Sequence, residues 1–193
     1  MDDTFKQVIT LLQNYDKQWA VCGGWAIDLF LNRQTRHHKD LDITIHRHHQ
    51  NYFQSFLLAH GWTLKKVIGS ELQEWEQDDY LELPVHNIWC SHPDFPPYYL
   101  EVLFSETTAT HYHFRRNQQI QISLDEAFLL SESNLPILAP EIVLLFKAKY
   151  RDEIPAYQQD FELTQPELNG TQRQWLKHAI MDTYGIHSWT EML

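Results

Sequence analysis

The chain has 193 residues, of which 43% are hydrophobic, and its 15 basic and 26 acidic side chains give a formal net charge of −11. This length suffices for one compact domain, or for a domain with a smaller companion. The negative charge disfavours nucleic acid as a partner and suits a cationic small molecule better. No apolar run reaches the roughly 20 residues that span a bilayer, and the N-terminus has no signal-peptide core, so a cytoplasmic protein is expected.

The first part of the chain shows a helical pattern followed by a short strand-like run. Apolar residues from Phe5 to Tyr15 recur at helical spacing and predict an amphipathic helix, and the run Trp19 to Cys22 predicts a strand. Gly23-Gly24 ends that strand, and the pattern from Trp25 to Leu31 is helical again. Two glycines between a strand and a helix let phosphate oxygens approach the backbone amides, although an ordinary tight turn can have the same sequence.

An alternating segment, DLDITIH at residues 40–46, follows a polar, basic loop at residues 32–39. The alternation predicts a half-buried strand with Asp40 and Asp42 on the same side. Two carboxylates so placed can converge on a hard cation such as Mg²⁺, which binds carboxylate, phosphate and water oxygens. By itself this pattern also occurs on solvent-facing sides of strands. The nearby histidine clusters fit polar loop positions better than a zinc site, because no cysteine accompanies them.

The middle of the chain contains a further helix and three more strands. Residues 49–60 have a helical pattern that ends at Gly61, and strand-like runs follow at Trp62 to Val67, Leu83 to Cys90 and Tyr98 to Phe104. This order of elements predicts a mixed α+β sheet with helices on one face.

Two other features of this region bear on the environment of the chain. The acidic stretch ELQEWEQDDYLE, from Glu71 to Glu82, is typical of a solvated loop, and alternatively it could line the entrance for a cationic substrate. Cys22 and Cys90 lie in apolar contexts, so both are expected to be buried and unpaired.

Glu101 interrupts the apolar strand-like segment YYLEVLF at residues 98–104. A buried glutamate is costly unless a cation or a hydrogen-bond donor meets it. If this strand lies beside DLDITIH, Glu101 completes a three-carboxylate site, as a metal ligand and as a base for an attacking hydroxyl. A salt bridge to an arginine is the structural alternative.

The pattern of the chain becomes helical near residue 136. A helix that begins at Pro140 and a second helix from Thr171 to Tyr184 predict a C-terminal helical subdomain over residues 136–193. The first domain is then expected to cover residues 1–135.

The segment GGWAIDLFLNRQTRHHKDLDITI, residues 23–45, resembles the signature of the aminoglycoside and lincosamide nucleotidyltransferase group of the polymerase-β-like nucleotidyltransferase superfamily. The similarity continues through LPVHNIWC, YYLEVLF, FRRNQQI, LAPEIVLLFKAK, TQRQWLKHAI and the closing HSW, so it covers nearly the whole chain. The resemblance implies an α+β nucleotidyltransferase domain with a mixed sheet, followed by a helical subdomain. Nucleotide and acceptor are then expected in the cleft between them.

The resemblance also implies roles for individual residues. The residues expected to be catalytic and to bind Mg²⁺, with two ions anticipated, are Asp40, Asp42 and Glu101. The residues expected to bind the nucleotide are Gly23, Gly24, Arg36, His38 and Lys147, with Lys149 as the alternative to Lys147. His86 and Arg116 are further candidates that could equally serve packing or an internal ion pair.

The chain departs from the group at two positions. The group often has Lys-Asp shortly before an Asp-Phe pair, whereas here Ala156-Tyr157 precedes Asp160-Phe161, so a nucleotide contact made by that Lys-Asp pair is in doubt. The third acid is Glu101 where the wider superfamily commonly has aspartate, so its longer side chain can sit differently against metal and acceptor.

The implied reaction is in-line attack of an acceptor hydroxyl on the α-phosphorus of ATP, which transfers AMP and releases pyrophosphate between two metal ions roughly 4 Å apart. The expected acceptor is a small hydroxylated molecule, such as an aminoglycoside or lincosamide antibiotic, and antibiotic resistance is one role that follows. Two alternatives stay open: a non-catalytic nucleotide-binding or regulatory protein, and a nucleotidyltransferase that acts on a protein or a tRNA. The sequence leaves open the acceptor, the choice between ATP and other nucleotides, and the oligomeric state.

Overall fold

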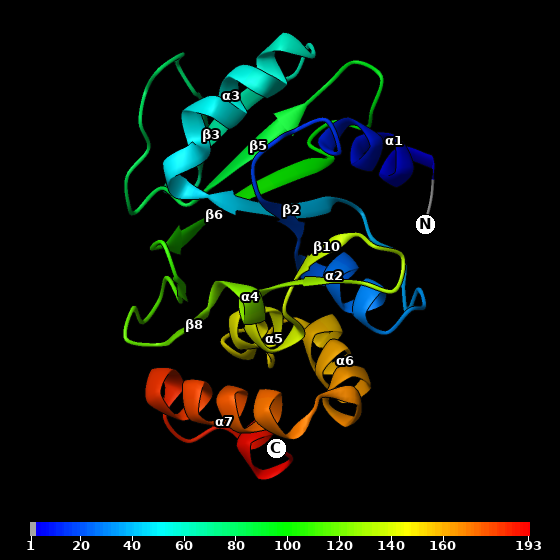
Figure 1. The fold of residues 1–193 in the computed structure, drawn as a ribbon, viewed down its shortest axis with the longest axis vertical. Helices are drawn as coiled ribbons and strands as arrows, with labels where there is room; N and C mark the ends of the chain where they lie inside the picture. Colours follow the sequence, from blue (N-terminus) through cyan, green and yellow to red (C-terminus); the bar gives the residue numbers. More distant parts are fainter. Residues whose placement is uncertain (1–2) are drawn as a thin grey trace.

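The computed structural model describes residues 3–193, which form a mixed sheet with helices on both of its faces (Figure 1). The helices are α1 (Asp3–Leu12), α2 (Gly23–Phe30), α3 (Gln50–Ala59), α4 (Leu124–Ala127), α5 (Pro140–Ala148), α6 (Pro155–Thr164) and α7 (Gly170–Tyr184). The strands are β1 (Trp19–Val21), β2 (Leu41–His46), β3 (Thr63–Ile68), β4 (Glu71–Glu74), β5 (Asn87–Ser91), β6 (Leu100–Thr107), β7 (His111–His113), β8 (Gln121–Ser123), β9 (Phe128–Leu130) and β10 (Pro136–Leu138).

The sheet combines parallel and antiparallel pairs. Its strand order is β4-β3-β5-β6-β2-β1-β10-β9, and β7 pairs with both β6 and β8. The pairs β2–β6 and β1–β10 are parallel, whereas β1–β2 and β5–β6 are antiparallel. The α+β class with a mixed sheet, predicted from the sequence, is therefore confirmed.

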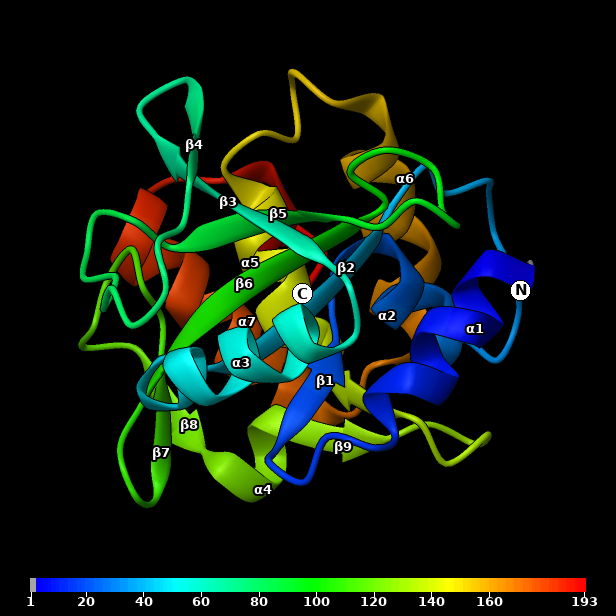
Figure 2. The same cartoon turned by 90° about the horizontal axis from the view of Figure 1, so that it is seen from above.

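Helices cover both faces of the sheet, so the prediction of helices on one face is wrong. In Figure 1, α3 lies on one side of the strands and α5, α6 and α7 lie on the other, and Figure 2 shows α3 in front of the strands with α5 behind them. The cause is visible in β2, where Ile43 is fully buried and Thr44, on the opposite face, is only 2% exposed. Thr44 faces a cavity that α5 also lines. The alternation in DLDITIH places apolar side chains on one face of β2 and the polar side chains of the cavity on the other, and helices cover both faces.

Most elements of the first half, including the short strand β1, lie where the sequence predicts them, whereas β5 begins at Asn87, four residues after the predicted start at Leu83. β2 occupies Leu41–His46 and α3 ends before Gly61. Part of the acidic stretch, predicted as a solvated loop, forms the exposed edge strand β4, and Trp75 within the stretch is buried. The hairpins formed by β7–β8 and β9–β10 consist of three-residue strands, which contain too few positions to show an alternating pattern.

The core contains the two cysteines, which are free and buried as predicted. β10 joins the sheet beside β1 through the Val21–Ile137 pair, and α5 begins directly after it. The division of the chain at residues 135 and 136 stays a prediction. In the described part of the chain, no helix has both the length and the apolar composition needed to cross a bilayer.

Candidate active site

A cavity of about 400 Å³ lies between the polar side of β2 and β6 and helix α5. Its lining includes the catalytic and nucleotide-binding candidates Gly23, Gly24, Arg36, His38, Asp40, Asp42, Glu101 and Lys147. His86 and Arg116 line it as well. Lys149 does not: it is exposed, with its Nζ 4.9 Å from the centre of the Tyr150 ring.

The turn from β1 into α2 forms one wall of this cavity, and it requires glycine at two successive positions. Gly23 has a φ of +61°, and a Cβ there would lie 1.8 Å from Oδ2 of Asp42. A Cβ on Gly24 would lie 2.4 Å from Nη2 of Arg36 and 2.6 Å from the ring of His38. No side chain caps the start of α2, so its first-turn amides are available to an anion.

Asp42 and Glu101 lie side by side across the parallel strands β2 and β6. They are register partners in that pair, so both side chains leave the sheet on the same face. Burial, followed by the charges of Glu101 and Asp40, raises the pKa of Asp42 well above its ordinary value. Burial and the charge of Asp40 also raise the pKa of Glu101, although a hydrogen bond from Asn87 opposes this. Two such carboxylates disfavour each other's ionisation, and a bound cation would relieve this.

The acids suit a cation that brings part of its own coordination shell. Within residues 3–193, no three His, Cys, Asp or Glu side chains converge into a ready-made metal cage. Mg²⁺ does not need one, because it keeps several waters and binds one or two carboxylates together with substrate phosphates. Asp42 and Glu101, with Asp40 close enough to raise both pKa values, fit that requirement.

Two of the predicted phosphate-binding cations meet at a single buried carboxylate. Asp160, on α6, is 1% exposed and accepts Lys147 Nζ at 2.8 Å and Arg36 Nη2 at 3.3 Å. Lys147 extends from the last turn of α5, and Arg36 belongs to the loop before β2. Asp160 therefore joins three segments at the edge of the cavity. The sequence contained it only as half of the Asp160-Phe161 pair, with no sign of these partners.

His38 is also fixed by a carboxylate. Its Nε2 lies 2.6 Å from Oδ2 of Asp28, both side chains are buried, and its ring packs on Trp25 at 4.4 Å between centroids. Asp28 accepts hydrogen bonds from Thr35 as well. His38 can therefore present only its opposite ring edge to Gly24 and the cavity.

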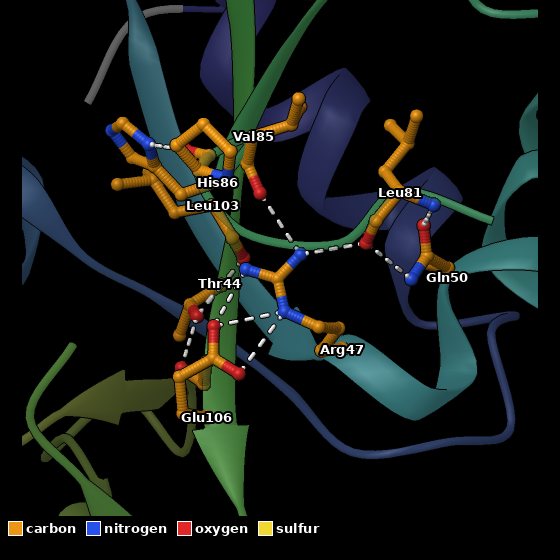
Figure 3. Close-up of polar contacts among 10 residues, drawn as sticks. Thr44, Arg47, Gln50, Leu81, Val85, His86, Leu103 and Glu106 are labelled. Atoms are coloured by element: carbon orange, nitrogen blue, oxygen red, sulfur yellow. Dashed lines mark hydrogen bonds and ion pairs between the residues drawn. The ribbon is translucent and has the colours of Figure 1, made fainter. Parts of the chain in front are cut away.

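The far end of the cavity is bounded by the segment that precedes β5. Arg47 fixes this segment, because its guanidinium donates to the carbonyls of Leu81 and Val85 at 2.8 and 2.9 Å and to both carboxylate oxygens of Glu106 (Figure 3). His86, the next residue, lines the cavity.

The sequence missed several residues of this cavity. The lining also includes Trp89, Tyr112, Arg115, Phe146, Tyr150 and Tyr157. Arg115 adjoins the candidate Arg116 in FRRNQQI, and the paired arginines were the only available signal. The acidic stretch from Glu71 to Glu82 contributes no residue to the lining, so its alternative role at a substrate entrance stays a prediction.

Comparisons with known proteins agree with this site. The sequence pattern of the aminoglycoside-2''-adenylyltransferase family matches residues 4–94, just under half of the chain. The crystal structure of ANT(2")-Ia in complex with adenylyl-2"-tobramycin superposes with a TM-score of 0.63 at 16% identity, over 94% of this chain and 97% of that one. The lincomycin-bound lincosamide adenylyltransferase LnuA gives 0.59 at 18% identity, over 84% of this chain and 95% of that one. No curated protein sequence matches the chain. These findings confirm the predicted resemblance and show that the chain has the fold of these nucleotidyltransferases.

Proposed function

We propose that this chain transfers AMP from ATP to a hydroxyl of a small molecule in a Mg²⁺-dependent reaction. Its fold is that of the aminoglycoside and lincosamide nucleotidyltransferases, and residues 4–94 match the aminoglycoside-2''-adenylyltransferase family. One observation carries this proposal. The uncapped start of α2 at Gly23, the registered carboxylates Asp42 and Glu101, and the cation Lys147 line the same cavity.

The triphosphate binds at the Gly23-Gly24 turn. The amides and positive end of α2 attract its oxygens, and the absence of side chains there allows them to approach. Arg36 and Lys147 offset the negative charge of the β- and γ-phosphates from two sides, since Asp160 holds both cations at this edge of the cavity. His38, held by Asp28, contributes its free ring edge beside Gly24.

The carboxylates act at the α-phosphate. Asp40, Asp42 and Glu101 would hold Mg²⁺, which supplies positive charge to the α-phosphate and to the attacking oxygen. Glu101 is placed to accept the proton of the acceptor hydroxyl, because it lines the cavity beside its register partner Asp42. Asn87 donates a hydrogen bond to Glu101 and so fixes the orientation of that base.

The acceptor is a small hydroxylated molecule. The solved complexes contain adenylyl-2"-tobramycin and lincomycin, so aminoglycosides and lincosamides are the first acceptors to test, with antibiotic resistance as the corresponding role. We place the enzyme in the cytoplasm, where ATP is available.

The test measures pyrophosphate release with ATP or GTP against tobramycin, lincomycin and unrelated polyols, with Mg²⁺ or with EDTA. We expect Mg²⁺-dependent release with at least one acceptor, a preference for ATP, and a loss of at least a hundredfold in Asp42→Asn. Asp125→Asn is the matched control, since Asp125 is exposed on α4 outside the cavity lining.

Two results would overturn the proposal. Turnover retained in Asp42→Asn would show that the site is assigned wrongly. Tight ATP binding that is insensitive to Mg²⁺, without pyrophosphate release for any acceptor, would instead favour a non-catalytic nucleotide-binding protein.

A further inference from the structure

The order of strands across the sheet distinguishes the end of the cavity that would bind the nucleotide from the end that would bind the acceptor. Gly23 follows β1, Asp42 lies on β2, Glu101 lies on β6, and the segment containing His86 leads into β5 on the other side of β6. In an in-line transfer the leaving pyrophosphate and the attacking hydroxyl lie on opposite sides of the α-phosphorus. With the triphosphate at Gly23, the acceptor approaches from the β5 and β6 side. This step rests on the proposed function.

The acceptor end of the cavity is cationic. Arg115 and Arg116 line the cavity together with His86, and they lie near enough to His86 for their charges, after burial, to lower its pKa. The only carboxylates in the lining of the whole cavity, within residues 3–193, are Asp40, Asp42 and Glu101. The end of the cavity where the acceptor would bind is therefore positively charged, although the chain as a whole has a negative net charge.

Arg116 already has its partners. Its Nη1 donates to the carbonyl of Phe146 at 2.9 Å and to the hydroxyl of Tyr184 at 3.0 Å. Its guanidinium also lies 5.2 Å from the centre of the Phe146 ring and 5.3 Å from that of Tyr150. These contacts connect the end of β7 to α5 and α7, so Arg116 has a structural role.

Arg115 has no such partners. Among residues 3–193, no acceptor lies within hydrogen-bond or ion-pair distance of its guanidinium, and its one ring contact is with Phe146 at 6.0 Å. Glu106 is near enough to act on its charge, but Arg47 engages both carboxylate oxygens of Glu106 (Figure 3). Burial and the neighbouring Arg116 lower the pKa of Arg115, and the nearby Tyr112 and Glu106 oppose this shift only in part.

A half-buried guanidinium with unused donors is suited to an oxyanion, because its planar fork matches carboxylate and phosphate geometry. A polyamine acceptor would instead place several positive charges beside Arg115 and Arg116. We propose that the acceptor is a hydroxylated molecule that carries a carboxylate or a phosphate, and that Arg115 binds this oxyanion while the hydroxyl faces Glu101. This proposal names the acceptor class of the proposed transferase and places aminoglycosides outside it.

Calorimetric titration of the protein saturated with Mg²⁺ and α,β-methylene-ATP tests this proposal. Gluconate and glucose 6-phosphate supply the two oxyanions, glucose is the neutral control and tobramycin is the polycation. We expect at least one of the anions to bind at least tenfold more tightly than glucose and tobramycin. Comparison of the two anions shows which oxyanion the site prefers.

Arg115→Met should remove the preference for anions, Arg115→Lys should retain part of it, and both should keep the wild-type affinity for the nucleotide. Loss of an unpaired guanidinium should leave the melting temperature unchanged. Arg33→Met is the control, because Arg33 is exposed and does not line the cavity.

The outcomes separate this inference from the proposed function. Tobramycin binding more tightly than the anions, no anion preference, or an Arg115→Met variant that weakens nucleotide rather than anion binding would each overturn the acceptor class alone. Absence of Mg²⁺-dependent nucleotide binding in the wild-type protein would overturn the proposed function and this inference with it.

Discussion

In the metal-free protein, charge repulsion between Asp42 and Glu101 should lower the free energy of unfolding. Asp42→Asn should remove this repulsion and stabilise the fold. Adjacent strands lie about 4.8 Å apart, so the backbones of two register partners are roughly 5 Å apart, and the carboxyls of Asp42 and Glu101 come close enough to share a hydrogen bond when one of them is protonated. At an effective dielectric constant of about 20, two negative charges about 5 Å apart repel each other by about 3 kcal/mol. Burial raises both pKa values, so partial protonation already relieves some of this repulsion.

We therefore expect Asp42→Asn to stabilise the metal-free protein by about 1–3 kcal/mol at pH 7.5, or roughly 2–10 °C in melting temperature for a chain of this size. The pH dependence has a definite sign. A carboxyl whose pKa is raised on folding contributes stability below its unfolded value near pH 4, and this stability is lost as the pH rises through the folded value. The wild-type melting temperature should thus fall more steeply than that of the variant as the pH rises above 4.

The assay is thermal unfolding with EDTA, and then with Mg²⁺ and α,β-methylene-ATP. Ligand at a hundred times its dissociation constant should stabilise the wild type by about 2.7 kcal/mol and the variant by much less. A variant that is less stable than the wild type in EDTA would refute the reasoning about repulsion. Equal stabilisation of both proteins by Mg²⁺ and nucleotide would refute the metal site.

Two other predictions concern buried carboxylates elsewhere. Asp160→Asn removes the shared partner of Arg36 and Lys147, so the free energy of unfolding of the nucleotide-free protein should fall by about 3–5 kcal/mol. Pyrophosphate should restore part of this loss, which thermal unfolding with and without pyrophosphate measures. Burial raises the pKa of Glu141 to about 7, so its stabilising contribution is complete below about pH 4.5 and is lost as the pH rises through 7. Glu141→Gln should accordingly exceed the wild type by up to about 3 kcal/mol at pH 8.5 in urea denaturation, with little difference near pH 5.

Each of these predictions has a control and a contrary result. Asp152→Asn removes an exposed carboxylate that pairs with Arg151 and should change stability by less than about 0.5 kcal/mol. An Asp160→Asn protein as stable as the wild type would show that Asp160 does not hold the two cations. A stability difference for Glu141→Gln that does not change with pH would show that Glu141 does not titrate in this range.

The part of the site that could be predicted depends on local signals. Alternation in residues 40–46 placed Asp42 on the correct side of β2, and the two glycines marked the turn into α2, because each pattern is complete within a few residues. The partnership of Glu101 with Asp42 needed only the assumption that their strands are neighbours, and β6 is indeed the parallel neighbour of β2.

The part that could not be predicted depends on distant partners. Asp160 pairs with Arg36, 124 positions away, and no sequence pattern signals such a contact. The same holds for the two arginines at 115 and 116, whose side chains are chemically identical in the sequence. Only the fold brings Phe146 and Tyr184 to one of them and leaves the other without an acceptor.

The contact of Asp160 with both Lys147 and Arg36 has a consequence for turnover. A phosphate chain that enters this end of the cavity meets cations that already share an internal anion, so it must compete with that anion to bind. The same competition acts on pyrophosphate after the transfer, and it limits how tightly the product can be held. In the proposed reaction, Asp160 would thus compete with the leaving pyrophosphate for Lys147 and Arg36, which weakens retention of the product and restores the empty site after each cycle.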